Sequence, residues 1–154
     1  MNLGDILLTE TVVPSLKAKD RWQAIEELVD ALIQSQSAQP QHREAILAVL
    51  KKREQTISTG IGFGIGIPHA TTDCVSEVIG AFGRSSTGID FAALDNQPVH
   101  LVVLFLVPQG QLRKHLDTLS SIAKFLQDKK FREQLMQAKD AQEILAIIKS
   151  QGVK

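Results

Sequence analysis

The most informative segment of the sequence is Val99-His100-Leu101-Val102-Val103-Leu104-Phe105-Leu106-Val107, in which eight of the nine residues are apolar. A near-continuous apolar run of this length is typical of a β-strand that is buried on both faces. The run is far too short to cross a bilayer as a helix. Pro108 and Gly110 follow it and end the strand. Residues 99–107 therefore predict a central strand with other layers packed against both of its faces.

Helical periodicity precedes this strand in the chain. Segment 20–34 begins at Asp20, a residue type that caps helix N-termini, and its apolar residues recur at intervals of three and four. A second helix is expected over 41–54. The residues of this helix that are predicted to face inward are Ala45, Ile46, Val49 and Leu50. Its last turn would carry three cations, which suit the negative end of the helix dipole.

Three more helices are expected after the strand, over 111–127, 129–138 and 140–149. A further strand is expected over 77–84. The order helix, helix, strands, helices is not a regular alternation of strands and helices, so the strands should run in both directions. We therefore predict an α/β fold for residues 1–154, a single layered domain with a mixed parallel/antiparallel β-sheet flanked by helices on both faces.

The composition is that of a folded chain without a net charge. Hydrophobic residues make up 44% of the 154 residues, and 17 Lys and Arg balance 17 Asp and Glu. Such a chain has no long-range field to attract nucleic acid or an anionic membrane surface, so neither is expected as a partner. The one cysteine, Cys74, cannot form an internal disulfide, and residues 1–8 lack the pattern of a signal peptide. These features predict a cytoplasmic protein that does not insert into a membrane.

The passage before the central strand alternates glycine with apolar residues. Glycines stand at positions 60, 62, 64 and 66, and Pro68 follows. A Walker loop would need Lys and then Ser or Thr after its last glycine, and a dinucleotide-binding turn would need glycines at positions one, three and six. Neither pattern is present, so a nucleotide-binding loop is not expected. The alternation predicts one or two short strands whose glycine face closely approaches another part of the backbone.

His69 ends the glycine passage and is the first candidate for chemistry. A neutral imidazole nitrogen is a competent nucleophile near pH 7. Pro68 has a fixed φ and restricts Ile67, so the position of the histidine should be well defined. We expect its ring to project from the edge of the sheet, where functional groups are commonly held. From the residues alone, a functional histidine and a structural imidazole tucked into the fold are equally compatible with this position.

His115 is the second candidate. It lies near the start of the 111–127 helix, beside the apolar row formed by Leu112, Leu116 and Leu119. The N-terminus of a helix offers N–H groups that favour an approaching phosphate. The alternative is a histidine at the boundary of the core that is half covered by the neighbouring leucines.

Arg53 would lie at the end of the 41–54 helix. Its side chain would either belong to a solvated helix end or hold an anion, since the guanidinium fork binds phosphoryl oxygens well. The two remaining histidines are not expected to take part in chemistry. His42 is assigned to the surface and His100 to the head of a strand.

Five blocks of the chain carry a resemblance to a known family. In chain order they are Arg53-Glu54, Ser58-Thr59-Gly60-Ile61-Gly62-Phe63-Gly64-Ile65-Gly66-Ile67-Pro68-His69-Ala70, Phe91-x-Ala93-x-Asp95-Asn96-Gln97-Pro98-Val99, Leu106-Val107-Pro108 and His115-Leu116-x-x-Leu119. Together they resemble the enzyme IIA component of the mannitol, fructose and nitrogen-related (type 2) branch of the bacterial phosphotransferase system. The resemblance extends over nearly the whole chain.

The resemblance implies a phosphoryl-carrier protein. In this family the histidine after Ile-Pro is phosphorylated, and it corresponds to His69 here. The family's upstream arginine corresponds to Arg53, and its second active-site histidine corresponds to His115. We therefore expect these three residues to be the catalytic residues of a phosphotransferase that forms a phosphohistidine. The expected donor is the phosphocarrier HPr or a relative of it, and neither a cofactor nor a metal is expected.

The downstream function stays open between two family roles. A stand-alone, nitrogen-related regulator is favoured by the block Asp95-Asn96-Gln97-Pro98-Val99 and by the lack of a fused domain. The alternative is a fructose- or mannitol-type component that passes phosphate to the IIB component of a sugar permease. Two alternatives belong to other classes. One is a binding module that is never phosphorylated, and the other is a metal site of His69 and His115 with Asp73 or Asp117.

Overall fold

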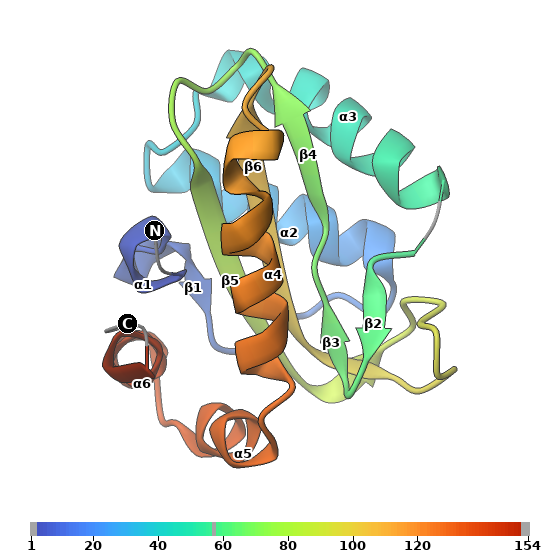
Figure 1. The fold of residues 1–154 in the computed structure, drawn as a ribbon, viewed down its shortest axis with the longest axis vertical. Helices are drawn as coiled ribbons and strands as arrows, with labels where there is room; N and C mark the ends of the chain where they lie inside the picture. The colour runs from blue at the N-terminus through green and yellow to red at the C-terminus, as the bar shows by residue number, and fades with distance from the viewer. Residues whose placement is uncertain (1–2, 57, 152–154) are drawn as a thin grey trace.

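One mixed sheet of six strands forms the middle of the molecule (Figure 1). The computed structural model describes residues 3–56 and 58–151 of the chain. The two long central strands, β5 (Ile79–Ile89) and β6 (Val99–Pro108), run antiparallel to each other. β6 is the strand predicted from residues 99–107, and its apolar side chains from Val99 to Val107 are at most 1% exposed. β5 extends across a bulge to Ile89, beyond the predicted end at residue 84.

The shorter strands give the sheet its mixed directions, as predicted. β1 (Val12–Val13) lies parallel to β5 at one edge. On the other side of β6, β3 (Ile65–Gly66) and β4 (His69–Thr72) pair with it in parallel, one after the other along its length. β2 (Gly60–Gly62) then pairs antiparallel with β3.

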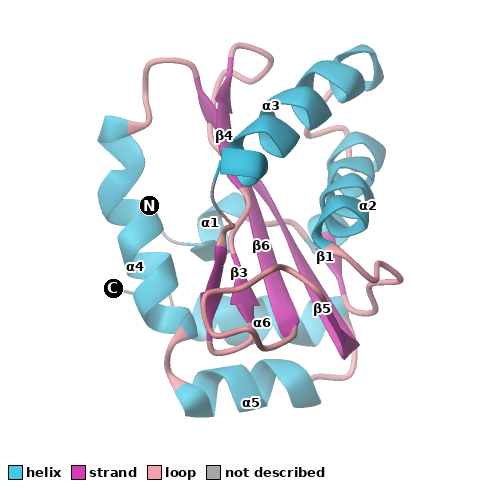
Figure 2. Cartoon of the chain, turned by 90° about the vertical axis from the view of Figure 1, so that its right-hand side faces the viewer, coloured by secondary structure: helices cyan, strands magenta, loops and turns pink. Residues whose placement is uncertain are grey.

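Helices cover both faces of this sheet. The helices on one face are α2 (Arg21–Gln34) and α3 (Arg43–Thr56). Those on the other face are α1 (Leu3–Ile6), α4 (Leu116–Leu126), α5 (Lys129–Gln137) and α6 (Ala141–Gln151) (Figures 1 and 2). The predicted α/β class with helices on both faces is confirmed. Within the described ranges, no helix is both long enough and apolar enough to cross a bilayer.

The central strand β6 supplies side chains to two separate cores because successive residues of a strand point to opposite faces. Leu104 and Leu106 belong to the core under α2 and α3. Leu101, Val103 and Phe105 belong to the core under α1, α4, α5 and α6. This alternation explains why the sequence of β6 is apolar throughout.

The helix predicted over 20–34 is α2, and its predicted cap is present. The Asp20 carboxylate accepts a hydrogen bond from the backbone N–H of Gln23 at 2.9 Å. This bond satisfies one of the N–H groups that the first turn of a helix leaves without a partner. Asp140 caps α6 in the same way, because its carboxylate accepts from the N–H of Glu143 at 2.9 Å.

The helix α3 begins and ends two residues later than the predicted 41–54, and a 3₁₀ turn over Pro40–His42 precedes it. Its buried residues are Ile46, Leu47, Leu50 and Glu54. Ala45 is exposed, so the prediction that it faces inward is wrong. The inward stripe is centred on positions 46, 50 and 54, which recur every four residues, and position 45 lies outside it.

The helix predicted over 111–127 is shorter at its start. A 3₁₀ turn, η3 (Arg113–His115), comes first, and α4 begins at Leu116. Leu112 and Leu116, two residues of the apolar row that the sequence places beside His115, are 38% and 49% exposed. The N-terminal end of α4 lies farther from the strands than its C-terminal end (Figure 2), so the first leucines do not reach the core. Ile122 and Leu126, nearer the C-terminal end, are buried.

The glycine passage forms the β2–β3 hairpin, in agreement with the predicted short strands. A Cβ on Gly60 would lie 2.9 Å from the Cα of Ala93, and a Cβ on Gly66 would lie 2.9 Å from the ring of Phe91. Neither position has room for a side chain. At Gly60 the close neighbour is backbone, as the sequence predicts, whereas Gly66 approaches the ring of Phe91. The hairpin ends where Ile67 and Pro68 lead into β4.

Candidate active site

His69 is the first residue of β4, a strand at the edge of the sheet. β4 pairs with β6 on one side, and α3 contacts it. His69 pairs with Phe105, and residues paired across two strands point to the same face. Its ring therefore lies on the face that α4, α5 and α6 cover, whereas Ala70 points into the core under α2 and α3. The ring is half-buried and lies at the sheet edge, where the sequence predicts it.

A hydrogen bond sets the tautomer of His69. The ring Nδ1 lies 2.8 Å from the carbonyl oxygen of Ile67. A carbonyl oxygen can only accept, so Nδ1 must carry the proton and donate it. In the neutral ring, the lone pair that is available to attack an electrophile is then on Nε2. Pro68 holds this segment against the sheet, because its carbonyl oxygen accepts from the N–H of Phe105 at 3.0 Å.

The surroundings of His69 keep its ring neutral near pH 7. Burial lowers the pKa of His69 below its ordinary value of 6.5, and the positive charge of Arg53 lowers it further. The hydrogen bond to Ile67 and the negative charge of Glu54 act in the opposite direction, but burial has the largest effect. A neutral imidazole keeps its lone pair, so the ring is ready to act as a nucleophile.

Arg53 lies in the last turn of α3 and is half-buried. Its guanidinium is near enough to His69 for its charge to act on the ring. The two side chains come from elements that are separate in sequence, and α3 brings them together by packing against β4. A fixed cation beside a neutral nucleophile favours the approach of an anionic electrophile.

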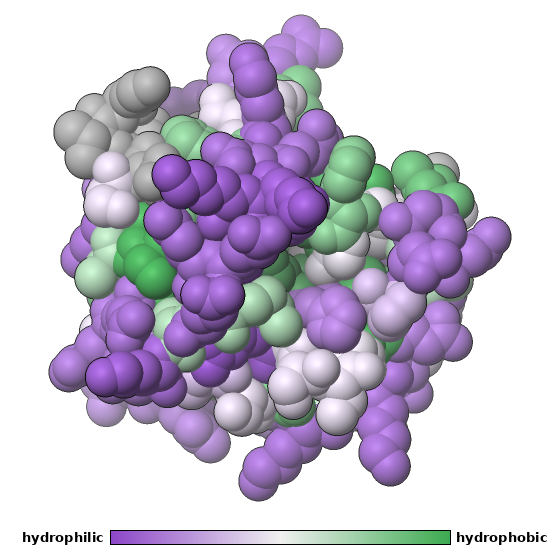
Figure 3. All heavy atoms as spheres, turned by 90° about the horizontal axis from the view of Figure 1, so that it is seen from below, coloured by the Kyte–Doolittle hydropathy of each residue, from purple (hydrophilic) through white to green (hydrophobic). Residues whose placement is uncertain are grey.

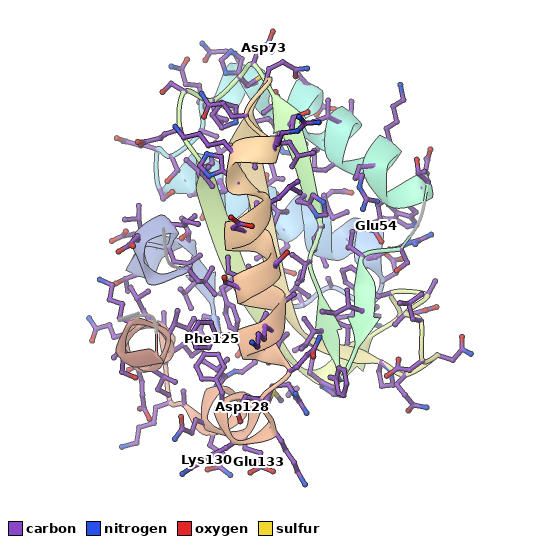
Figure 4. All side chains as sticks on the ribbon, in the orientation of Figure 1. Glu54, Asp73, Phe125, Asp128, Lys130 and Glu133 are labelled. Carbon is purple, nitrogen blue, oxygen red and sulfur yellow. The ribbon has the colours of Figure 1, made fainter. Side chains whose placement is uncertain are left out.

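Glu54, the residue after Arg53, is buried and hydrogen-bonded next to the site, although it was not among the predicted site residues. Its side chain is only 1% exposed and accepts hydrogen bonds from the N–H and the hydroxyl of Thr59, at 2.9 and 2.6 Å. A third contact, at 3.4 Å, comes from the guanidinium of Arg21. Figure 4 shows Glu54 between the C-terminal end of α3 and β2. Its spacing of four residues from the buried Leu50 was the signal in the sequence that could have revealed its burial.

His115 occupies the N-cap position of α4 without a capping hydrogen bond from its side chain, and it is buried, at 8% exposed. The chain reaches it directly from the end of β6, where the N–H of Gln109 donates to the carbonyl of Thr72 at 3.0 Å. His115 therefore follows a loop that is joined to the end of β4, and the helix α4 that begins after it covers the face of the sheet where the His69 ring lies. Within the described part of the chain, no hydrogen bond joins the rings of these two histidines.

The other histidines have different surroundings. The Nδ1 of His100 donates to the carbonyl of Ser85 at 2.8 Å, which agrees with its assignment to a strand end. His42 is half-buried instead of fully at the surface, and its Nδ1 has no hydrogen-bond partner. Over residues 3–56 and 58–151, no three His, Cys, Asp or Glu side chains gather as a metal site would require. The alternative metal site of His69 and His115 therefore gains no support.

A model of the family described as "Phosphoenolpyruvate-dependent sugar phosphotransferase system, EIIA 2" matches residues 5–151 of the chain. The chain is 34% identical over 148 residues to the nitrogen regulatory protein of Bradyrhizobium diazoefficiens, and the match covers 96% of this chain and 95% of that protein. It is 41% identical over 125 residues to the fructose-specific EIIA component of Haloferax volcanii, with 81% and 80% covered.

The fold is also that of a solved relative. The crystal structure of the nitrogen regulatory protein IIA-Ntr from Neisseria meningitidis superimposes with a TM-score of 0.85 at 32% identity, and it covers 95% of this chain and 98% of that chain. The family model and these relatives agree with the resemblance found in the sequence. This chain belongs to the EIIA type 2 family of the phosphoenolpyruvate-dependent sugar phosphotransferase system.

Proposed function

We propose that the chain is one cytoplasmic phosphoryl-carrier domain, phosphorylated on Nε2 of His69 by a phosphohistidine of an HPr-like donor. The lone pair of Nε2 attacks phosphorus, a new N–P bond forms, and the donor's N–P bond breaks. The electron pair of the broken bond returns to the donor's ring nitrogen. The proton on Nδ1 of His69 stays on the hydrogen bond to Ile67. The phosphoryl group is then passed on to an acceptor protein.

The observation that carries this proposal is the state of the His69 ring. It is neutral, and its Nδ1 is occupied by the Ile67 carbonyl at 2.8 Å, so Nε2 is left as the nucleophile. Phosphoryl transfer requires little of the protein beyond positioning and charge stabilisation. The charge of Arg53 acts on the ring, and its guanidinium would bind the phosphoryl oxygens.

His115 has the second role in the proposal. Its ring would donate a hydrogen bond to the phosphoryl group as the donor approaches. The exposed Leu112 and Leu116 on either side of it would form part of the surface on which the donor docks.

A regulatory role follows if the phosphorylated state is read by partner proteins. It is supported by the nitrogen regulatory relative, which matches this chain over almost the full length of both proteins. The alternative is delivery of phosphate to a IIB component of a sugar permease, and the 41% identity to a fructose-specific EIIA component favours it. Transfer of label from the phosphorylated chain to purified fructose or mannitol IIB would support the second role, and lack of transfer would support the first.

The central test is phosphorylation in vitro. The chain is incubated with enzyme I, HPr and phosphoenolpyruvate, and its intact mass is measured. We expect a gain of one phosphoryl group that is lost in acid, as a phosphoramidate should be. His69→Ala should abolish the gain, because it removes the nucleophile, and His42→Ala is the control that should leave it unchanged. Phosphorylation of His69→Ala to the same extent would refute the assignment.

The two supporting residues are tested by rates in the same reaction. Arg53→Lys keeps the positive charge but loses the planar fork, and His115→Ala removes the ring. Both variants should be phosphorylated at least about tenfold more slowly, since a positioned donor to developing charge contributes a factor of about 10²–10³ where it is fully effective. Rates equal to that of the unmodified chain would remove these residues from the mechanism.

A further inference from the structure

Four residues form an unbroken chain of hydrogen bonds that starts at Glu54 and ends at His69. The carboxylate of Glu54 accepts from the hydroxyl and the N–H of Thr59. The carbonyl of Thr59 accepts from the N–H of Ile67 at 3.0 Å. The carbonyl of Ile67 accepts from Nδ1 of His69 at 2.8 Å. We propose that Glu54 and Thr59 are positioning residues, which act through this chain to hold the His69 ring in the correct tautomer and orientation beside Arg53.

The links between these residues are mechanical. The N–H and the carbonyl of Thr59 belong to different peptide groups, and so do those of Ile67. Each link therefore fixes the place of the next residue in space and does not pass charge to it. Pro68 adds to the stiffness, because its φ is fixed and the peptide bond before it has no N–H. A shift of Thr59 is consequently transmitted to the carbonyl that orients the imidazole.

Burial of Glu54 supports a positioning role. A carboxylate that is 1% exposed has lost its hydration, which is costly unless its oxygens are hydrogen-bonded. An apolar residue would continue the buried stripe of Ile46 and Leu50 without this cost. The two oxygens of the carboxylate accept one donor of Thr59 each, so that both the backbone and the side chain of Thr59 are held. Thr59 is itself only 4% exposed.

The same carboxylate also determines where Arg53 lies. Glu54 is the next residue in the last turn of α3, so anchoring it to Thr59 and Arg21 anchors the end of the helix that carries Arg53. One group thus sets the position of the cation through the helix and that of the nucleophile through Thr59. The spacing between these two groups matters because a displacement of about 1 Å at a reacting centre can reduce a rate by about a hundredfold.

Thr59→Val is the sharpest test, because valine keeps the shape of threonine and removes only the hydroxyl. Thr11→Val is a matched control. Thr11 is 1% exposed, and its hydroxyl bonds to the backbone of Leu8, in a part of the chain away from β4. Thr59→Ser keeps a hydroxyl at this position and should keep the rate of phosphoryl transfer. Glu54→Gln keeps the volume of the side chain and tests the Glu54 end of the hydrogen-bond series. It also provides the test if Thr59→Val does not fold.

Two measurements are made on each variant. The first is the tautomer of His69, from the ¹⁵N NMR shifts of its ring in the unphosphorylated protein. The second is the single-turnover rate of transfer from phosphorylated HPr, a readout that rests on the proposed function. We expect Thr59→Val and Glu54→Gln to mix the two tautomers and to slow transfer about tenfold or more. Thr11→Val and Thr59→Ser should stay within about twofold of the unmodified rate and keep one tautomer.

The outcomes separate this inference from the proposed function. If the unmodified chain is phosphorylated and the folded Thr59→Val and Glu54→Gln keep both its tautomer and its rate, the positioning role is wrong. If the unmodified chain is not phosphorylated at all, the proposed function fails, and the NMR measurement still decides whether Thr59 and Glu54 set the tautomer. An equal loss of rate in Thr11→Val would assign the effect to general destabilisation and overturn the inference.

Discussion

At the scale of single residues, the proposed chemistry depends on a histidine whose surroundings favour its neutral form. His69 lies on an edge strand, where a ring can be half-buried and still be reached from outside the sheet. Burial favours the neutral form, and the hydrogen bond to Ile67 decides which nitrogen carries the proton. A fully exposed histidine would have neither property, and the ring of a fully buried one could not be reached from outside the sheet.

The lowered pKa of His69 predicts a dependence of stability on pH. Well above pH 6.5 the ring is neutral in both the folded and the unfolded chain, so it does not change the free energy of unfolding with pH there. As the pH falls below 6.5, the unfolded chain binds a proton that the folded chain resists, and the free energy of unfolding decreases. Urea unfolding at a series of pH values should therefore show a smaller acid-induced loss of stability in His69→Gln than in the unmodified chain. An equal loss in both would contradict the lowered pKa.

At the scale of elements, one arginine of the sheet completes the end of a helix. α5 ends at Gln137 without a glycine cap, so the carbonyl groups of its last turn have no partners within the helix itself. The guanidinium of Arg84, on β5, donates to the carbonyls of Leu135 and Ala138 at 2.9 and 2.6 Å. Its Nε donates to the carbonyl of Pro14 at 2.9 Å. Arg84 thus joins β5 to the helical layer on one side and to the chain after β1 on the other.

Loss of this cap predicts a measurable destabilisation. Arg84→Gln cannot reach all three carbonyls, and we expect the free energy of unfolding to fall by about 2–3 kcal/mol. Arg43→Gln is the matched control, because Arg43 forms ion pairs with Asp30 and Glu44, which are 45% and 87% exposed. Exposed ion pairs contribute little, so this control should change stability much less. Urea denaturation of both variants gives the comparison, and equal effects would show that Arg84 is not a cap.

At the scale of the whole molecule, two hydrophobic cores share one sheet. One core lies under α2 and α3 and the other under α1, α4, α5 and α6, and the side chains of β6 enter both. The face of the surface drawn in Figure 3 is more hydrophilic than these cores. Seen from below, hydrophilic residues predominate and hydrophobic ones are scattered among them (Figure 3). The two cores should therefore unfold together, since neither can be exposed without breaking the strand that they share.

Joint unfolding of the two cores can be tested with a substitution in one core and a fluorescent probe in the other. Trp22, the single tryptophan, packs against the core under α2 and α3, whereas Leu101 is 1% exposed in the opposite core. Leu101→Ala should lower the free energy of unfolding by about 2–5 kcal/mol. The fluorescence of Trp22 and the far-UV circular dichroism should give the same lowered midpoint. A Trp22 transition that does not move would show that the two cores unfold independently.

The parts of this protein whose signals are local could be predicted from the sequence. β6 was recognisable because a strand buried on both faces must be apolar throughout, and α2 because its cap and its periodic apolar residues lie within one segment. The glycine passage and Pro68 were enough to indicate that His69 is held at a defined place. The five sequence blocks then led to the family that the comparisons confirmed.

How these parts meet depends on contacts between segments that are distant in the sequence. β1 and β4 have two and four residues, too few to show any periodicity, and they exist because β5 and β6 offer them partners. The nearness of Arg53 to His69, the burial of Glu54 and the exposure of Leu116 likewise depend on how α3 and α4 lie against the sheet. A local pattern specifies an element and its inward face. Contacts between distant segments are set by tertiary packing, which no local pattern records and which can override local propensity.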